Sequence, residues 1–198
     1  MKIGFRGKPA PFVKQKLSIG PRYKTVRHSL WIYLSVCDIL WAGQTASKKS
    51  GADTREQNDL FYVCSLIEYT ARKTKNKRKV IVDLMGKKGI EKQLYDAAVN
   101  HCLSFEQVSD EWIEQYKIPY GNFDTISECK YSIPSPTDIG RLYALMIQDC
   151  AAPGDEAEEM IRIFSSFISE EISDFSTDLY YQNPSYLECP YKEGHLLD

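Results

Sequence analysis

The feature that most constrains the fold of this chain is a long stretch without proline. Prolines stand at positions 9, 11 and 21, and the next one is Pro119, so 97 consecutive residues lack a proline. Proline breaks a helix interior because it has no N–H to donate and its ring clashes with the preceding turn. A proline-free stretch of this length therefore favours a unit built from helices.

Apolar residues recur at helical spacing within this stretch. A first stripe follows the spacing i, i+3, i+4, i+7, i+11 of one helix face: Leu60, Val63, Cys64, Ile67 and Ala71. A second stripe at 80–85 is followed by Gly86 and Gly89, which are typical of a helix end, although residues 79–83 also fit a short strand. A third stripe spans 94–99. Ser104 and Gln107 then have the spacing of a capping box that opens another helix.

The second half of the chain continues this pattern. Thr137 is a candidate cap for a helix with Leu142, Leu145 and Met146 on one side. After a turn at 153–155, one long amphipathic helix is predicted from 155 to 179. That helix carries a stripe expected to be buried: Phe164, Phe167, Ile168, Ile172 and Phe175. Asn183 and Pro184 have the order expected at the start of a short last helix.

These patterns predict an all-α fold, a compact bundle of six to eight helices with an irregular N-terminal arm. We expect four parts: a basic arm over 1–27, a helical unit over 28–118, a linker or loop over 119–136, and a second helical unit over 137–198 that packs on the first. The length of 198 residues is sufficient for one hydrophobic core.

Charge is distributed unevenly along the chain. Residues 1–37 contain eight Lys and Arg and no acid, whereas residues 142–198 contain twelve acids and two basic residues. We expect the arm to contact either the acidic C-terminal region or a charged partner. The formal net charge of −2 excludes a polycation that binds nucleic acid through its overall charge.

The six cysteines are widely spaced, and no CxxC motif occurs. We therefore expect free thiols, no disulfide and no zinc site. The most apolar run, residues 30–42, is shorter than the ~20 residues that span a bilayer. It favours a buried core helix, with no membrane role and a cytoplasmic location.

One segment concentrates basic residues between two predicted helices. It could contact phosphate or an acidic partner surface, or form a solvated loop. The candidate contact residues are Arg72, Lys73, Lys75, Lys77, Arg78, Lys79, Lys87 and Lys88. His101 is a weaker functional candidate. Its neighbour Cys102 points about 100° away on a helix, so the two do not form a nucleophile–base pair. No catalytic motif or cofactor fingerprint occurs, and no cofactor is expected.

Residues 59–118 contain short motifs that resemble a known family. The motifs are Asp59-Leu-Phe-Tyr-Val-Cys64, Ile67-Glu68, Lys79-Val-Ile-Val-Asp-Leu84, Gly89-Ile90 and Asn100-His101. They resemble a family of small uncharacterised bacterial proteins whose genes commonly lie beside a second family resembling ADP-ribosyltransferase toxins. The chain departs from that family in a longer connection around 76–79 and in lacking a glycine after His101. The resemblance implies a partner-binding or antitoxin-like role and assigns no catalytic residue.

Three functional hypotheses follow. The first is a non-enzymatic helical protein–protein interaction module, antitoxin-like or accessory to an ADP-ribosyltransferase-like toxin. The second is a nucleic-acid-binding regulator that uses residues 72–92. The third is an enzyme whose site is assembled from residues scattered along the chain.

Overall fold

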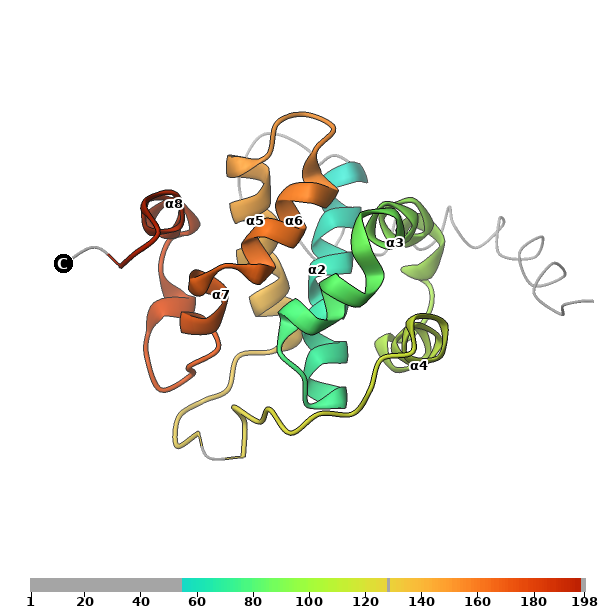
Figure 1. Cartoon of the computed structure of the whole chain (residues 1–198), viewed down its shortest axis with the longest axis horizontal. Coiled ribbons are helices and arrows are strands. Elements are labelled where there is room, and N and C mark those ends of the chain that lie inside the picture. Colours follow the sequence, from blue (N-terminus) through green and yellow to red (C-terminus); the bar gives the residue numbers. More distant parts are fainter. Residues whose placement is uncertain (1–54, 128, 197–198) are drawn as a thin grey trace, which may run out of the picture.

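The computed structural model describes residues 55–196 with the exception of residue 128 (Figure 1). Helices account for 70% of this part, and it contains no strand. The prediction of an all-α bundle is therefore confirmed for the described residues, with seven α-helices. The basic arm, the apolar run over 30–42 and Cys37 lie outside the described residues.

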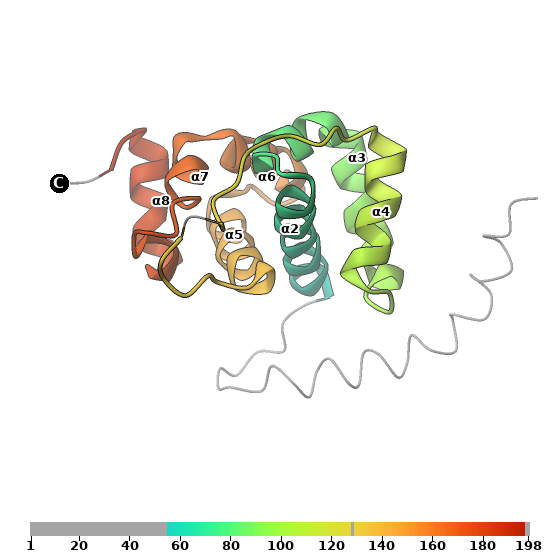
Figure 2. The ribbon, with the colours of Figure 1, turned by 90° about the horizontal axis from the view of Figure 1, so that it is seen from below.

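Helix α2 (Arg55–Thr74) lies at the centre of the fold. It packs against α5 (Pro136–Cys150) on one side and against α3 (Arg78–Asn100) and α4 (Phe105–Tyr116) on the other (Figure 2). The predicted stripe on α2 is buried, and neighbouring positions such as Leu66 and Thr70 are buried too. A helix covered on several sides must also bury some polar residues, and Glu68 is one of them.

Two of the predicted helix starts are correct and one is displaced. Ser104 caps α4 by accepting the Gln107 N–H at 3.2 Å, and Asn183 caps α8 (Pro184–Glu193) by accepting the Ser185 N–H. The prediction of Thr137 as the cap of α5 is wrong. Ser135 caps that helix in a capping box with Asp138, because Pro136 occupies the first helical position and leaves Ser135 outside the helix.

Helix α3 differs from the prediction in two ways. The short strand over 79–83 is wrong, because these residues form the first turns of α3. Gly86 interrupts the helical backbone with φ +61°, but Gly89 does not end the helix. A Cβ at Gly89 would lie 3.1 Å from the Tyr116 ring, so glycine lets α3 approach α4 closely.

The long amphipathic helix predicted over 155–179 is broken into shorter elements. These are α6 (Glu156–Ser165), α7 (Phe167–Glu171) and a 3-10 turn at Leu179–Tyr181. The break falls at Ser166, whose backbone is extended and whose hydroxyl donates to the Ile163 carbonyl at 2.6 Å. This local bond competes with helix continuation.

The apolar stripe of that segment is nevertheless inside the fold. Phe164, Ile168, Ile172 and Phe175 are buried, as predicted, while Phe167 is only partly buried. The five cysteines in the described part are free thiols. No helix within residues 55–196 is long and apolar enough to cross a bilayer.

Candidate functional site

The structure distributes the predicted basic residues over helix ends instead of one long loop. Helix α2 continues to Thr74 and α3 begins at Arg78, so only residues 75–77 connect them. Six of the eight side chains form ion pairs with acids of the same chain. The pairs are Arg72–Glu68, Lys73–Asp110, Lys75–Asp124, Lys77–Glu170, Arg78–Glu68 and Lys87–Glu158. Lys79 and Lys88 form no ion pair with a residue in the described part of the chain.

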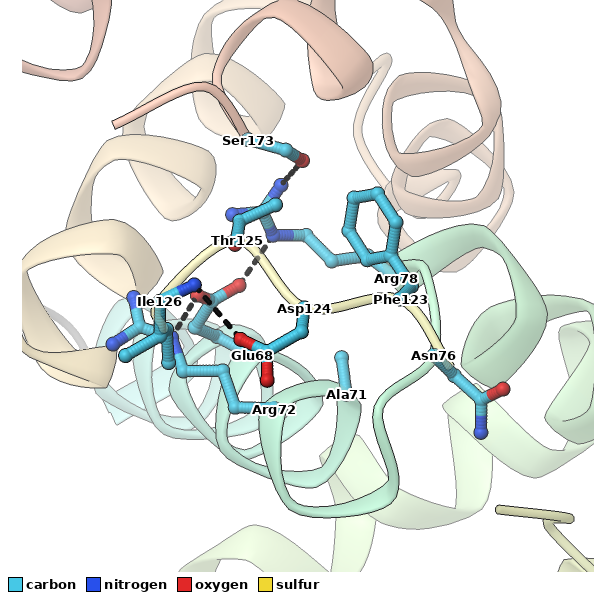
Figure 3. A pocket seen from close by; sticks show the side chains of 10 residues that line it. All are labelled: Glu68, Ala71, Arg72, Asn76, Arg78, Phe123, Asp124, Thr125, Ile126 and Ser173. Carbon is cyan, nitrogen blue, oxygen red and sulfur yellow. Dashed lines mark hydrogen bonds and ion pairs between the residues drawn. The ribbon is translucent and has the colours of Figure 1, made fainter. Parts of the chain in front are cut away.

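Two of these cations belong to a buried cluster around Glu68. The Glu68 carboxylate accepts from Arg72 Nε at 2.5 Å through one oxygen and from Arg78 Nε through the other. Arg72 also donates to the Pro134 carbonyl at 2.9 Å, and Arg78 donates to the Ser173 hydroxyl at 2.6 Å. The cluster therefore joins α2, α3, the segment before α5 and the residues after α7. Figure 3 shows Glu68, Arg72, Arg78 and Ser173 of this cluster.

The electrostatic balance within the cluster favours ionised groups. Burial acts to raise the pKa of Glu68, but the charges of Arg78 and Arg72 outweigh it and hold that pKa below its ordinary value. Burial likewise acts to lower the pKa of Arg78, and the Glu68 carboxylate outweighs it and raises that pKa. Two guanidinium groups thus share one carboxylate, which leaves a net charge of +1 in the interior.

An irregular segment covers this cluster. Residues 121–126 cross the end of α2 between α4 and α5 (Figures 1 and 3). Asp124 anchors the segment, because its carboxylate accepts from the Ile126 and Ser127 amides at 3.0 Å and pairs with Lys75 at 3.1 Å. These bonds hold the pKa of Asp124 well below its ordinary value. A cavity of about 30 Å³ remains between the segment and the cluster, which is room for one water molecule.

A larger pocket of about 210 Å³ opens on the other side of Arg78. It lies between the start of α3 and the α6–α7 junction. Cationic side chains, serine hydroxyls and two phenylalanine rings line it: Lys77, Arg78, Lys79, Ser165, Ser166, Ser169, Ser173, Glu170, Phe123 and Phe164. The basic run in the sequence predicted its three cationic residues but not the serines, which lie about 90 residues further along the chain.

A groove of about 560 Å³ lies elsewhere, at the N-terminal end of α2. Leu60 and Leu94 supply apolar surface, and Glu56, Asp59 and Glu156 supply carboxylates. Gln57, Gln148 and Gly154 are the other described residues of its lining. No sequence pattern predicted this groove, because its residues come from four separate parts of the chain and share no motif.

His101 lies close to this groove through its contact with Asp59. Its Nε2 is 3.5 Å from Asp59 Oδ1, and its ring centroid is 4.5 Å from that of Tyr62. These contacts connect the end of α3 with the start of α2. Within the described residues, no group of three or more His, Cys, Asp or Glu side chains is placed to hold a metal ion.

Comparisons with known proteins add no relative. No protein-family model matches the chain, and no curated protein or solved structure matches it either. The resemblance of residues 59–118 to a toxin-adjacent family therefore remains a prediction.

Proposed function

We propose that the chain is a non-enzymatic protein–protein interaction module whose groove binds a basic, partly apolar segment of a partner protein. The observation that carries this proposal is the composition of the groove at the start of α2. Its volume of about 560 Å³ is within the range of roughly 300–1,000 Å³ typical of binding pockets. Its leucines offer apolar contact, and its carboxylates favour a cationic ligand.

The carboxylates differ in how far the chain already neutralises them. Asp59 lies near Arg55 at 3.9 Å and His101 at 3.5 Å. Within the described residues, Glu156 accepts only the Gly154 N–H, at 3.1 Å, and Glu56 forms no ion pair. Glu56 and Glu156 are therefore the groups that a lysine or arginine of a partner would contact.

The pairing of the basic residues favours this proposal over a nucleic-acid-binding regulator. Affinity for a phosphate backbone depends on lysines and arginines that are free to neutralise phosphates. Six of the eight candidate side chains are in ion pairs, and two of these six surround the Glu68 carboxylate. Binding a nucleic acid through residues 72–92 would require several of these pairs to break.

The partner suggested by the family resemblance is an ADP-ribosyltransferase-like toxin encoded beside this chain. Under this proposal the toxin presents a basic segment to the groove, and the chain acts as its antitoxin or accessory protein. Co-expression of the two proteins tests this finer proposal, with co-purification of a stable complex as the expected result.

The groove itself is tested with a fluorescent peptide of alternating lysine and leucine, titrated with the full chain by fluorescence polarisation. The double variant Glu56→Gln/Glu156→Gln should weaken binding by about threefold to tenfold, as expected for two partly exposed charge contacts. The matched control, Glu114→Gln/Glu171→Gln, removes two exposed acids outside the groove and should leave the affinity unchanged. Equal affinity of the two double variants would refute the assignment of the groove.

A further inference from the structure

The described residues that line the pocket beside Arg78 carry more positive than negative charge. Lys77, Arg78 and Lys79 are consecutive residues at the start of α3, and all three line the pocket. Among the described residues, Glu170 is the only carboxylate in its lining. Together with the adjoining cluster, four cations (these three and Arg72) face two carboxylates, Glu68 and Glu170.

We propose that this pocket binds the phosphate group of a small phosphate monoester. The proposal concerns a site separate from the groove and is independent of the proposed function.

The cations are arranged so that they can reach such a ligand. Lys79 is exposed and forms no ion pair with a described residue. Lys77 is half exposed. Its ammonium lies 2.8 Å from Glu170 and 5.7 Å from the centroid of the Phe123 ring. Arg78 is held in place by the Glu68 carboxylate and Ser173, so its charge lies at a fixed position in the pocket wall.

The start of α3, which belongs to the pocket lining, also has free backbone donors. A phosphate oxygen accepts hydrogen bonds, and the first turn of a helix offers backbone N–H groups without helical acceptors. Lys77, which precedes α3, provides no side-chain cap, and no described residue accepts from the amides of Arg78 and Lys79. Ser165 also belongs to the pocket lining, and its hydroxyl oxygen is itself buried and has no hydrogen-bond partner among the described residues.

The pocket volume indicates the size of the ligand. At about 210 Å³ the pocket has room for more than a phosphate ion, yet it is smaller than the roughly 300–1,000 Å³ of pockets that hold drug-sized molecules. Phe123 and Phe164 provide apolar wall beside the cations. A phosphate joined to a short organic group fits this combination, and its charge would offset the excess positive charge near Arg78.

Isothermal titration calorimetry on the full chain tests the proposal with glycerol 3-phosphate and inorganic phosphate at constant ionic strength, with glycerol as the unphosphorylated control. We expect saturable binding of glycerol 3-phosphate and none of glycerol. Saturable binding of inorganic phosphate alone would overturn the assignment to a monoester. Absence of saturable binding of either phosphate compound would overturn the site.

Three variants assign the binding to this pocket. Lys79→Gln should weaken binding about tenfold, because a charge-assisted hydrogen bond is lost. Glu170→Gln should tighten binding severalfold, because it removes the carboxylate that competes with phosphate for Lys77. Lys88→Gln, an exposed lysine of the same helix outside the pocket, is the matched control and should bind as the parent does. Unchanged binding by Lys79→Gln, or weaker binding by Glu170→Gln, would contradict the proposal.

These results are distinguishable from a failure of the groove. Glu56→Gln/Glu156→Gln should leave phosphate binding unchanged, since neither residue lines the pocket. A loss of phosphate binding in that variant would overturn the placement of the phosphate site beside Arg78.

Discussion

Replacing Glu68 by glutamine should be among the most destabilising polar substitutions in this chain. Glu68 is 2% exposed and holds two guanidinium groups, one of which, Arg78, is 5% exposed. Removing one partner of a buried ion pair leaves an uncompensated buried charge, which costs about 3–5 kcal/mol. A protein of ordinary stability has a free energy of unfolding of about 5–15 kcal/mol, so a large share would be lost.

Urea unfolding at 25 °C and pH 7, followed by circular dichroism, measures this loss. Glu171→Gln, an exposed acid at the end of α7, is the control and should change the free energy of unfolding by less than about 0.5 kcal/mol. A loss below about 1 kcal/mol for Glu68→Gln would refute the argument, because it would mean that the guanidinium groups find water or another partner.

The same variant tests the sign of the pKa shift. The pKa of Glu68 is lower in the folded chain than its value of about 4.3 in an unfolded one. Ionised Glu68 therefore stabilises the fold fully at a pH above its pKa in the unfolded chain. This stabilisation is lost as the pH falls through its pKa in the folded chain. The stability difference between the parent and Glu68→Gln should consequently narrow below about pH 4. A difference that widens in acid would show that the pKa is raised instead.

Three further results are expected from other parts of the fold. Gly140→Ala should lower the free energy of unfolding by about 1–3 kcal/mol in urea, because its Cβ would lie 2.1 Å from the Ser65 hydroxyl and would force α5 away from α2. Gly86→Ala should lower the free energy of unfolding by a similar amount, about 1–3 kcal/mol, through backbone strain alone, since its φ is +61° and no atom lies within 4 Å of the new Cβ. An unchanged free energy of unfolding would contradict the kink in α3. Iodoacetamide at pH 8 should label exposed Cys189 rapidly and leave buried Cys64 unmodified in the folded chain, since burial raises the pKa of the Cys64 thiol. Equal labelling of the two cysteines, measured by mass spectrometry, would contradict the burial of Cys64.

The helices were predictable where local chemistry decides them. The apolar spacing on α2 and the caps at Ser104 and Asn183 depend on residues within a few positions of each other. Ser166 was not predictable in the same way. The sequence around it continues the amphipathic pattern, and the helix end is evident only from the extended Ser166 backbone and the bond from its hydroxyl to the Ile163 carbonyl.

The site was less predictable because pairing across the chain decides it. A run of basic residues identifies Lys77 and Lys87, yet their partners Glu170 and Glu158 lie 93 and 71 residues away. Glu68 had one usable signal. It lies four positions after Cys64, which is part of the apolar stripe, and four positions before Arg72, a spacing that suits an ion pair on the same helix face.

The long sequence separation between Arg78 and its acceptors also affects the order in which the chain can fold during its synthesis. Its bonds to the Ser169 carbonyl and the Ser173 hydroxyl span 91 and 95 residues. At a translation rate of about 5–20 residues per second, Ser173 leaves the ribosome on the order of 5–20 s after Arg78. During that interval α2 and α3 can form, but the Arg78 guanidinium still lacks both of these acceptors and has the Glu68 carboxylate as its partner. Until α7 has emerged and packed, the Arg78 guanidinium donates to water in place of Ser169 and Ser173, so its burial is completed only with the last part of the fold.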